Sequence, residues 1–206
     1  MKKIIFILIA IVILFSACST HKATINSFVE PTYRTGQIKT IAMFPIRNAQ
    51  LAPSEARAIN KDIIKAMNSK NPDINLIAPS KVIRIINESN LASEWADFID
   101  DYYTSGIADK TTLLKFSKLL NCDAIFQGNL LRVSQRDGSR TIPAVTRVSV
   151  EFTIVENRTA KVIWNITSDG VRAESAKFGQ FTIIAPAIQE AIDLSIVKIS
   201  NNIPNL

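Results

Sequence analysis

The order of apolar and polar positions predicts a chain of alternating helices and strands after residue 37. The clearest signal lies in 147–155, where every second residue is apolar and its neighbours are polar. Such alternation predicts a strand with one buried face, as in antiparallel sheet. Short apolar runs at 38–46 and 124–133 predict two further strands, and apolar residues recur at helical spacing over 53–68 and 109–120.

The remaining segments complete one domain. A short strand is expected at 74–78, a helix from residue 79, a short helix with a loop in 91–108, and a strand at 161–167. A final helix is expected over 182–200. Without the short helix in 91–108, the order is βαβααβββα. It predicts a single α+β domain, a mixed sheet with helices packed on it, with a mixed-sheet α/β arrangement as the alternative. The inner face of the final helix is expected to hold Ile184, Ile188, Ala191, Ile192 and Ser195.

The first residues have the anatomy of a secretory signal peptide. Lys2 and Lys3 precede an apolar run, and Ser16 and Ala17 lead directly into Cys18. The segment Phe15-Ser16-Ala17-Cys18 resembles a bacterial lipobox, which implies cleavage before Cys18 and attachment of a diacylglycerol to its thiol. An uncleaved signal anchor is the alternative, but the apolar run is shorter than the roughly 20 residues of a membrane span.

The lipobox divides the chain into three parts. Residues 1–17 are the predicted signal peptide, 18–36 a lipidated N-terminus with a short, polar, irregular tether, and 37–206 the globular domain. Attachment through Cys18 predicts a membrane-bound protein outside the cytoplasm. Ser19 follows the cysteine, and by resemblance to enterobacterial sorting this favours the outer membrane. The domain then faces the periplasm, with exposure at the cell surface as the alternative.

Charge and cysteine content exclude several classes of function. Lysine and arginine total 24 against 18 acidic residues, but they are scattered and form no basic run interleaved with aromatic residues. No nucleic-acid partner is therefore expected. The chain has two cysteines. If Cys18 carries lipid, Cys122 has no partner for an intramolecular disulfide, and a small buried thiol is expected there.

Several segments together suggest a family. The strand 41–45 opens the domain, 76–79 leads into a helix, 119–128 joins a helix to a strand, and 161–164 closes a strand. In this order they resemble the bacterial envelope lipoproteins with a TolB amino-terminal-like domain. That group includes the curli secretion channel lipoprotein and the penicillin-binding-protein activator lipoproteins.

The resemblance implies a fold and an envelope location but no chemistry. Asp123 and Gly128 match fold markers of the group, Asp123 at a helix-to-strand turn and Gly128 where a bare backbone fits. The chain lacks the long amphipathic hairpins of the curli channel. Its tether is also shorter than the stalk that the activator lipoproteins commonly carry.

The sequence indicates no catalytic centre. Its one histidine, His21, lies in the predicted tether, so His-based catalysis and multi-His metal sites are not expected. No phosphate-binding loop, dinucleotide fingerprint or nucleophile-elbow motif occurs. We therefore expect no catalytic residue, no metal and no cofactor.

One stretch stands out as a candidate binding surface, because carboxylates and aromatic residues alternate in it. It holds Glu94 and Asp100 and a predicted partner surface of Trp95, Asp97, Phe98, Asp101, Tyr102 and Tyr103. A cation site, a carbohydrate-contacting patch and a protein-binding surface are the functional interpretations. The alternative is a solvated acidic face over aromatic side chains that pack into the core.

These observations predict a non-catalytic, membrane-anchored lipoprotein. It would act as an accessory, assembly or activator component of an envelope machine for secretion, cell wall or surface assembly, through an envelope protein partner. Homo-oligomerisation stays open. A small-ligand sensor that uses a crevice between sheet and helices is the alternative. A hydrolase with Glu94, Asp97 or Asp101 as acid and base is a further one.

Overall fold

A computed structural model describes residues 20–47, 50–176 and 180–206, so the predicted signal peptide and Cys18 lie outside the described residues. The described chain forms an α+β domain, as predicted, in which helices cover one mixed six-stranded sheet. Its elements are β1 (Thr20–Val29), β2 (Thr40–Met43), α2 (Pro53–Lys70), β3 (Asn75–Ile77), α3 (Pro79–Glu88), α4 (Ala92–Ser105), α5 (Lys110–Leu120), β4 (Ala124–Arg136), β5 (Gly138–Ser139), β6 (Ala144–Glu156), β7 (Val162–Glu174), β8 (Thr182–Ile183) and α6 (Ile188–Ser200).

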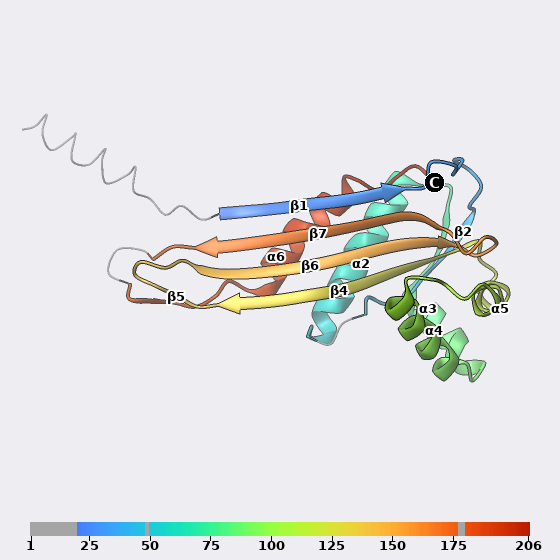
Figure 1. Ribbon diagram of the computed structural model, residues 1–206, viewed down its shortest axis with the longest axis horizontal. Coiled ribbons are helices and arrows are strands. Elements are labelled where there is room, and N and C mark those ends of the chain that lie inside the picture. Colours follow the sequence, from blue (N-terminus) through green and yellow to red (C-terminus); the bar gives the residue numbers. More distant parts are fainter. Residues whose placement is uncertain (1–19, 48–49, 177–179) are drawn as a thin grey trace, which may run out of the picture.

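The sheet has the strand order β1-β7-β6-β4-β2-β3. β2 runs parallel to β3 and β4, whereas β4, β6, β7 and β1 are antiparallel neighbours. Parallel neighbours need a crossover, and α2 supplies it between β2 and β3. The helices α3, α4 and α5 then return the chain from β3 to β4 on the other side of β2. The four long strands extend well beyond α3, α4 and α5 toward the end where β1 begins (Figure 1). The molecule therefore has a helical end and a strand end.

Two hydrophobic layers hold the sheet between helices. Successive strand residues point to opposite faces, so Ile41 belongs to one layer and Ala42 to the other. The first layer joins α2 and α6 to the long strands and includes the fully buried Trp164 and Phe152. The second lies under α3, α4 and α5 at the helical end, around the buried Phe116.

The predicted alternation in β6 is confirmed. Its even-numbered residues from 148 to 154 are buried in the first layer, and Arg147 is exposed on the opposite face. The predicted close contact at Gly128 is also confirmed. A Cβ there would lie 2.6 Å from a ring carbon of Phe152, so only glycine fits beside that ring.

The turn after α5 is built from the residues that the sequence singled out. Cys122 is buried, as expected, and burial raises the pKa of its thiol to about 11, although Asn157 donates a hydrogen bond to its sulfur. Asp123 Oδ2 accepts from the backbone N–H groups of Lys39 and Thr40, both at 2.9 Å. The carboxylate thus fixes the start of β2 against the start of β4.

The expectation of an irregular tether was wrong for residues 20–29. This stretch forms β1, which pairs antiparallel with β7 from Thr20 opposite Ala173 to Val29 opposite Trp164. The sequence of β1 shows no alternation of apolar and polar residues, because β1 is an edge strand whose side chains are almost all exposed. Backbone hydrogen bonds to the edge of β7 determine its conformation, and side-chain patterning does not register them. His21 is exposed on this strand and contacts Arg172 of β7.

The last helix begins later than predicted. α6 starts at Ile188, while Thr182 and Ile183 form β8 opposite β5. Pro186 explains the difference, since a proline disfavours helical backbone in the residue before it. Ile184 therefore lies outside the helix and is exposed, in contrast to the inner position expected for it. The rest of the predicted inner face is buried or partly buried.

Candidate functional site

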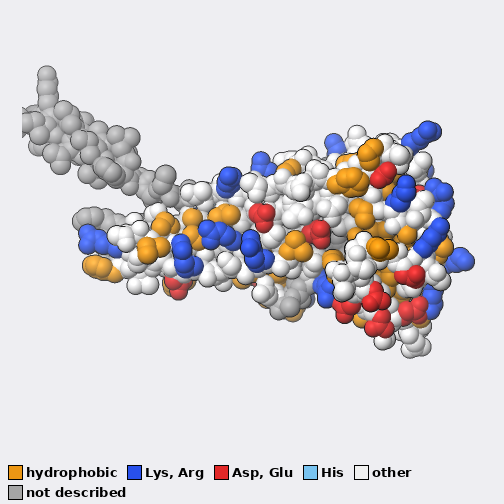
Figure 2. Space-filling view, viewed as in Figure 1, with side chains coloured by type: hydrophobic (Ala, Val, Ile, Leu, Met, Phe, Trp, Pro, Cys, Tyr) orange, Lys and Arg blue, Asp and Glu red, His pale blue; other side chains and the backbone are white. Residues whose placement is uncertain are grey.

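Helix α4 carries the predicted partner surface at the helical end of the molecule. It is longer than the short helix expected there, and it ends at Gly106, whose left-handed backbone (φ 72°) lets its N–H bond the Tyr102 carbonyl. Trp95, Phe98 and Tyr102 recur at helical spacing and face the second hydrophobic layer. The acidic residues between them face outward, and they gather on this end in Figure 2.

Two of the predicted surface residues are core anchors instead. Phe98 is 7% exposed, so its inclusion in a partner surface is corrected. Trp95 is half-buried and stacks on Phe44, with ring centroids 3.6 Å apart and planes 14° apart. Its edge also meets Phe116 at 4.9 Å. These contacts match the alternative interpretation of an aromatic anchor beneath an acidic face.

The two tyrosines lie between α4 and the sheet. Their rings meet edge to face with centroids 5.5 Å apart, and the guanidinium of Arg47 lies 5.0 Å above the Tyr103 ring. Burial raises the pKa of both phenols above the usual value, and the nearby Glu151 on β6 acts in the same direction. Both tyrosines therefore stay neutral at physiological pH and offer hydroxyl groups, not charges.

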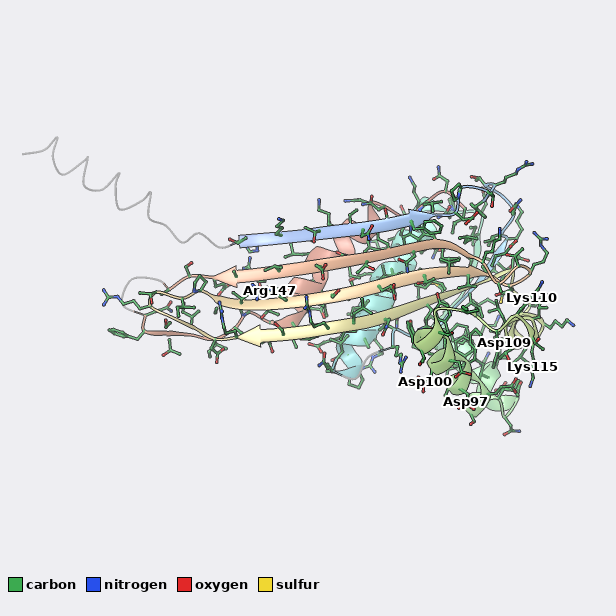
Figure 3. The ribbon with its side chains drawn as sticks, in the orientation of Figure 1. Asp97, Asp100, Asp109, Lys110, Lys115 and Arg147 are labelled. Atoms are coloured by element: carbon green, nitrogen blue, oxygen red, sulfur yellow. The ribbon has the colours of Figure 1, made fainter. Side chains whose placement is uncertain are left out.

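The four carboxylates of the stretch divide into two classes. Asp100 forms an ion pair with Arg47 at 2.7 Å, and Glu94 pairs with Lys115 of α5. Asp97 and Asp101 are exposed one helical turn apart, and within the described residues neither carboxylate has an ion-pair partner. Figure 3 shows Asp97 and Asp100 on α4, far from Arg147 on the long strands. Two uncompensated negative charges thus remain on the outer face of α4.

A hollow of about 210 Å³ lies beside these residues, between α4 and the end of β2. Trp95 and Phe44 supply apolar walls, and the Arg47–Asp100 pair stands at its edge. Gln127 on β4 also lines it and is 6% exposed. Its amide nitrogen donates to the carbonyls of Pro45 and Gly128. Its side-chain oxygen has no hydrogen-bond partner among the described residues.

The unpartnered oxygen of Gln127 is informative because buried polar atoms in native proteins almost always have a partner. Arg47 and Gln127 were not predicted at this site, because Arg47 follows β2 and Gln127 lies on β4, both far from α4 in the chain. The pairing of β2 with β4 and the bridge of Arg47 to Asn129 bring both residues beside α4.

A second hollow separates α2 from α6 on the opposite side of the sheet. It encloses about 570 Å³ and is lined by Asp62 and Lys65 of α2 and by Ile196 and Val197 of α6, among others. In the part of the chain that the structure describes, no three His, Cys, Asp or Glu side chains are grouped to hold a metal ion. None of the helices described there is long and apolar enough to cross a membrane.

The chain matches no known family model and no curated protein. Solved structures with a similar course of the chain include the following three. The PelC dodecamer of Paraburkholderia phytofirmans has a TM-score of 0.48 and 14% identity, over 86% of this chain and 94% of that chain. Lipoprotein GNA1162 of Neisseria meningitidis has a TM-score of 0.48 and 15% identity, over 80% of this chain and 99% of that chain. The LpoB C-terminal domain of Salmonella enterica has a TM-score of 0.39 and 9% identity, over 71% of this chain and 87% of that chain.

The structures that this chain resembles thus include a bacterial lipoprotein. All three TM-scores are below 0.5 and all identities are far below 25%, so this likeness assigns no family, activity or partner. The relationship to TolB-like envelope lipoproteins stays a prediction from the sequence segments.

Proposed function

We propose that this protein is a non-catalytic lipoprotein that uses the outer face of α4 to bind a protein partner in the bacterial envelope. The observation that carries the proposal is the hollow beside Trp95, which Asp100 borders and which Gln127 lines with a buried oxygen that lacks a donor among the described residues. Asp97 and Asp101 add two unpaired carboxylates on the exposed face of the same helix. A partner side chain with N–H groups, arginine above all, matches this combination of acceptor, negative charge and aromatic wall.

The location rests on the N-terminal segment. Cys18 in its lipobox would anchor the chain to a membrane outside the cytoplasm, and Ser19 favours the outer membrane with the domain facing the periplasm. The α4 surface and the anchor then lie at opposite ends of the molecule, because β1 begins at the strand end (Figure 1). This separation suits an accessory protein that presents its binding surface away from the membrane to a secretion, cell-wall or surface-assembly machine.

We propose no catalytic role for the acidic residues. A carboxylate-dependent hydrolase places its two acids on either side of the bond to be broken. Asp97 and Asp101 instead share one exposed helix face, and Asp100 is occupied by Arg47. The arrangement favours recognition of a cationic group over proton transfer.

In-cell photocrosslinking tests the proposal. A photoreactive amino acid at position 97 is expected to capture one dominant envelope protein, whereas the same residue at Lys61, exposed on α2, captures it weakly or not at all. Asp97→Asn combined with Asp101→Asn should reduce capture several-fold from a photoreactive residue at position 93, also on α4. The matched control is Asp62→Asn with Asp73→Asn, which removes the same charge elsewhere.

Three outcomes would overturn partner binding at α4. They are equal capture from positions 97 and 61, no specific capture at all, and capture that both double variants leave unchanged. Capture of a second copy of this chain from position 97 would instead identify the partner as the protein itself. Activity of the purified protein on an envelope polymer that Asp97→Asn abolishes would contradict the non-catalytic role.

The hollow between α2 and α6 favours one alternative, a small-ligand sensor. Its volume of about 570 Å³ lies within the usual range for ligand sites, and apolar and charged side chains both line it. A ligand bound there would raise the melting temperature of the protein in a screen of envelope metabolites. Val197→Trp, which narrows the hollow, should abolish that shift, and Ile83→Trp on exposed α3 should not.

A further inference from the structure

The strand end of the molecule lies next to the predicted lipid anchor. β1 begins at Thr20 opposite Ala173, and β6 begins at Ala144 opposite Glu174, so three long strands end together. Cys18 precedes Thr20 by two residues, and two residues of chain span at most about 7 Å. A membrane that holds the lipid of Cys18 must therefore lie close to this end of the molecule. Figure 1 shows that β5 lies at the same end.

Three large apolar side chains are exposed at the same end. Ile142 precedes β6 and is 50% exposed, Phe181 precedes β8 and is 72% exposed, and Ile184 follows β8 and is 81% exposed. We call these three residues the apolar tip. They come from two loops that the chain separates by about forty residues, so their gathering is a product of the fold. Exposed apolar residues scattered singly need no explanation, but a cluster marks a contact surface.

The tip is held in place by several contacts. β5 pairs with β8, which joins the two loops. Asp137 Oδ1 accepts a hydrogen bond from the N–H of Ala185 at 2.8 Å, and Gln135 donates to the Pro186 carbonyl at 2.9 Å. A Cβ at Gly138 would lie 2.3 Å from the backbone nitrogen of Ala144, so the first loop is also tightly closed. These contacts hold the loops so that the side chains of Ile184 and Phe181 point outward. Exposed there, they add no burial of apolar surface to the stability of the isolated domain.

Several basic side chains lie at the same end as the apolar tip, together with the acidic Asp137 and Glu174. Arg140 lies over the Phe181 ring at 6.0 Å, and Arg136, the last residue of β4, pairs with Val145 near the start of β6. Lys22 of β1 and Arg147 of β6 follow within three residues of the strand ends, on the face that α2 and α6 leave open. Figure 2 shows basic side chains along this part of the long strands. Apolar side chains with a basic border are the usual composition of surfaces that bind anionic lipid headgroups.

We infer that the apolar tip is a second membrane contact, which inserts into the headgroup region of the bilayer that holds the anchor. The inference rests on lipidation of Cys18 in the proposed function, which sets how close the bilayer lies. Two contacts fix the orientation of the domain on the membrane, whereas a single anchor leaves the domain free to rotate about it. Ile142, Phe181 and Ile184 then enter the interface, Arg136 and Arg140 meet lipid phosphates, and α4 points away from the membrane.

The test uses the mature, lipidated protein in vesicles of phosphatidylethanolamine and phosphatidylglycerol. An environment-sensitive fluorophore is attached to Ile184→Cys and, as the matched control, to Ile107→Cys, which is 74% exposed at the helical end. Cys122 is buried and stays unlabelled. Nitroxide-bearing lipids should quench the probe at 184 several-fold more than the probe at 107. Arg136→Glu with Arg140→Glu should lower the quenching at 184 several-fold.

The outcomes separate the tip from the anchor. Protein that floats with the vesicles while both probes remain in water would overturn the tip contact and leave the anchor intact. Equal quenching at 184 and 107 would also overturn it, since the domain would then lie flat or tumble. Protein that does not float at all would contradict lipidation of Cys18. An apolar environment at 184 without vesicles would show contact between copies of the chain instead of membrane contact.

Discussion

Gly170 is expected to tolerate no side chain, because helix α6 packs directly on it. It lies in β7 where α6 crosses the sheet, and a Cβ there would sit 2.1 Å from the carbonyl oxygen of Ala191 and 2.6 Å from Ser195 Oγ. An ordinary carbon–oxygen contact is about 3.3 Å, so α6 must move by about 1.2 Å. Overpacking of a core costs about 1–3 kcal/mol, and because a helix backbone is the obstacle we expect about 3 kcal/mol for Gly170→Ala.

Urea unfolding followed by circular dichroism measures this loss of unfolding free energy. In a thermal melt the same loss, at about 2–4 °C per kcal/mol, corresponds to a fall in Tm of about 6–12 °C. Gly106→Ala is the control, since its Cβ meets no atom within 4 Å and its φ of 72° costs about 1 kcal/mol. Adding Ser195→Ala should not rescue Gly170→Ala, because the nearest obstacle is the Ala191 backbone. Gly170→Ala with unchanged stability would refute the close approach of α6, because alanine is otherwise favoured over glycine in a strand.

Further predictions concern single side chains. The native mature protein should show no thiol that reacts quickly with a maleimide, because Cys18 carries lipid and Cys122 is buried with a raised pKa. Unfolding should expose the single thiol of Cys122 to the reagent. A fast-reacting thiol in the native state would contradict acylation of Cys18. Hydrogen bonds from Thr112 lower the pKa of Asp109, so the stability that this N-cap adds is present above the usual aspartate pKa and is lost as pH falls through the lowered value. Asp109→Ala should therefore lower the urea midpoint at pH 7 but not in strong acid, and a constant difference would disprove the assignment. Trp95→Ala should cost about 2–4 kcal/mol of unfolding free energy, because the ring stacks in the core, and a loss under 1 kcal/mol would show it to be a surface residue.

The candidate site was predictable only in part. The alternation of acids and aromatic residues located α4 correctly, and helical spacing foretold that Asp97 and Asp101 share a face. The same pattern did not separate Phe98, which is buried, from the tyrosines, which are partly exposed. Residue type alone does not distinguish an aromatic anchor from an aromatic contact, since both are apolar and the neighbouring elements decide which is covered.

The sequence by itself determined the local elements of this protein: the alternating β6, the capped helix after Asp109, and the turn at Cys122 and Asp123. These depend on residues close in the chain, whose spacing and hydrogen-bonding groups act locally. Only the tertiary structure decided that residues 20–29 join the sheet as β1, because the edge of β7 supplies their hydrogen bonds. It also decided which distant segments meet, as Arg47 pairs with Asp100 and β5 pairs with β8, since strand order has no local signature in the chain.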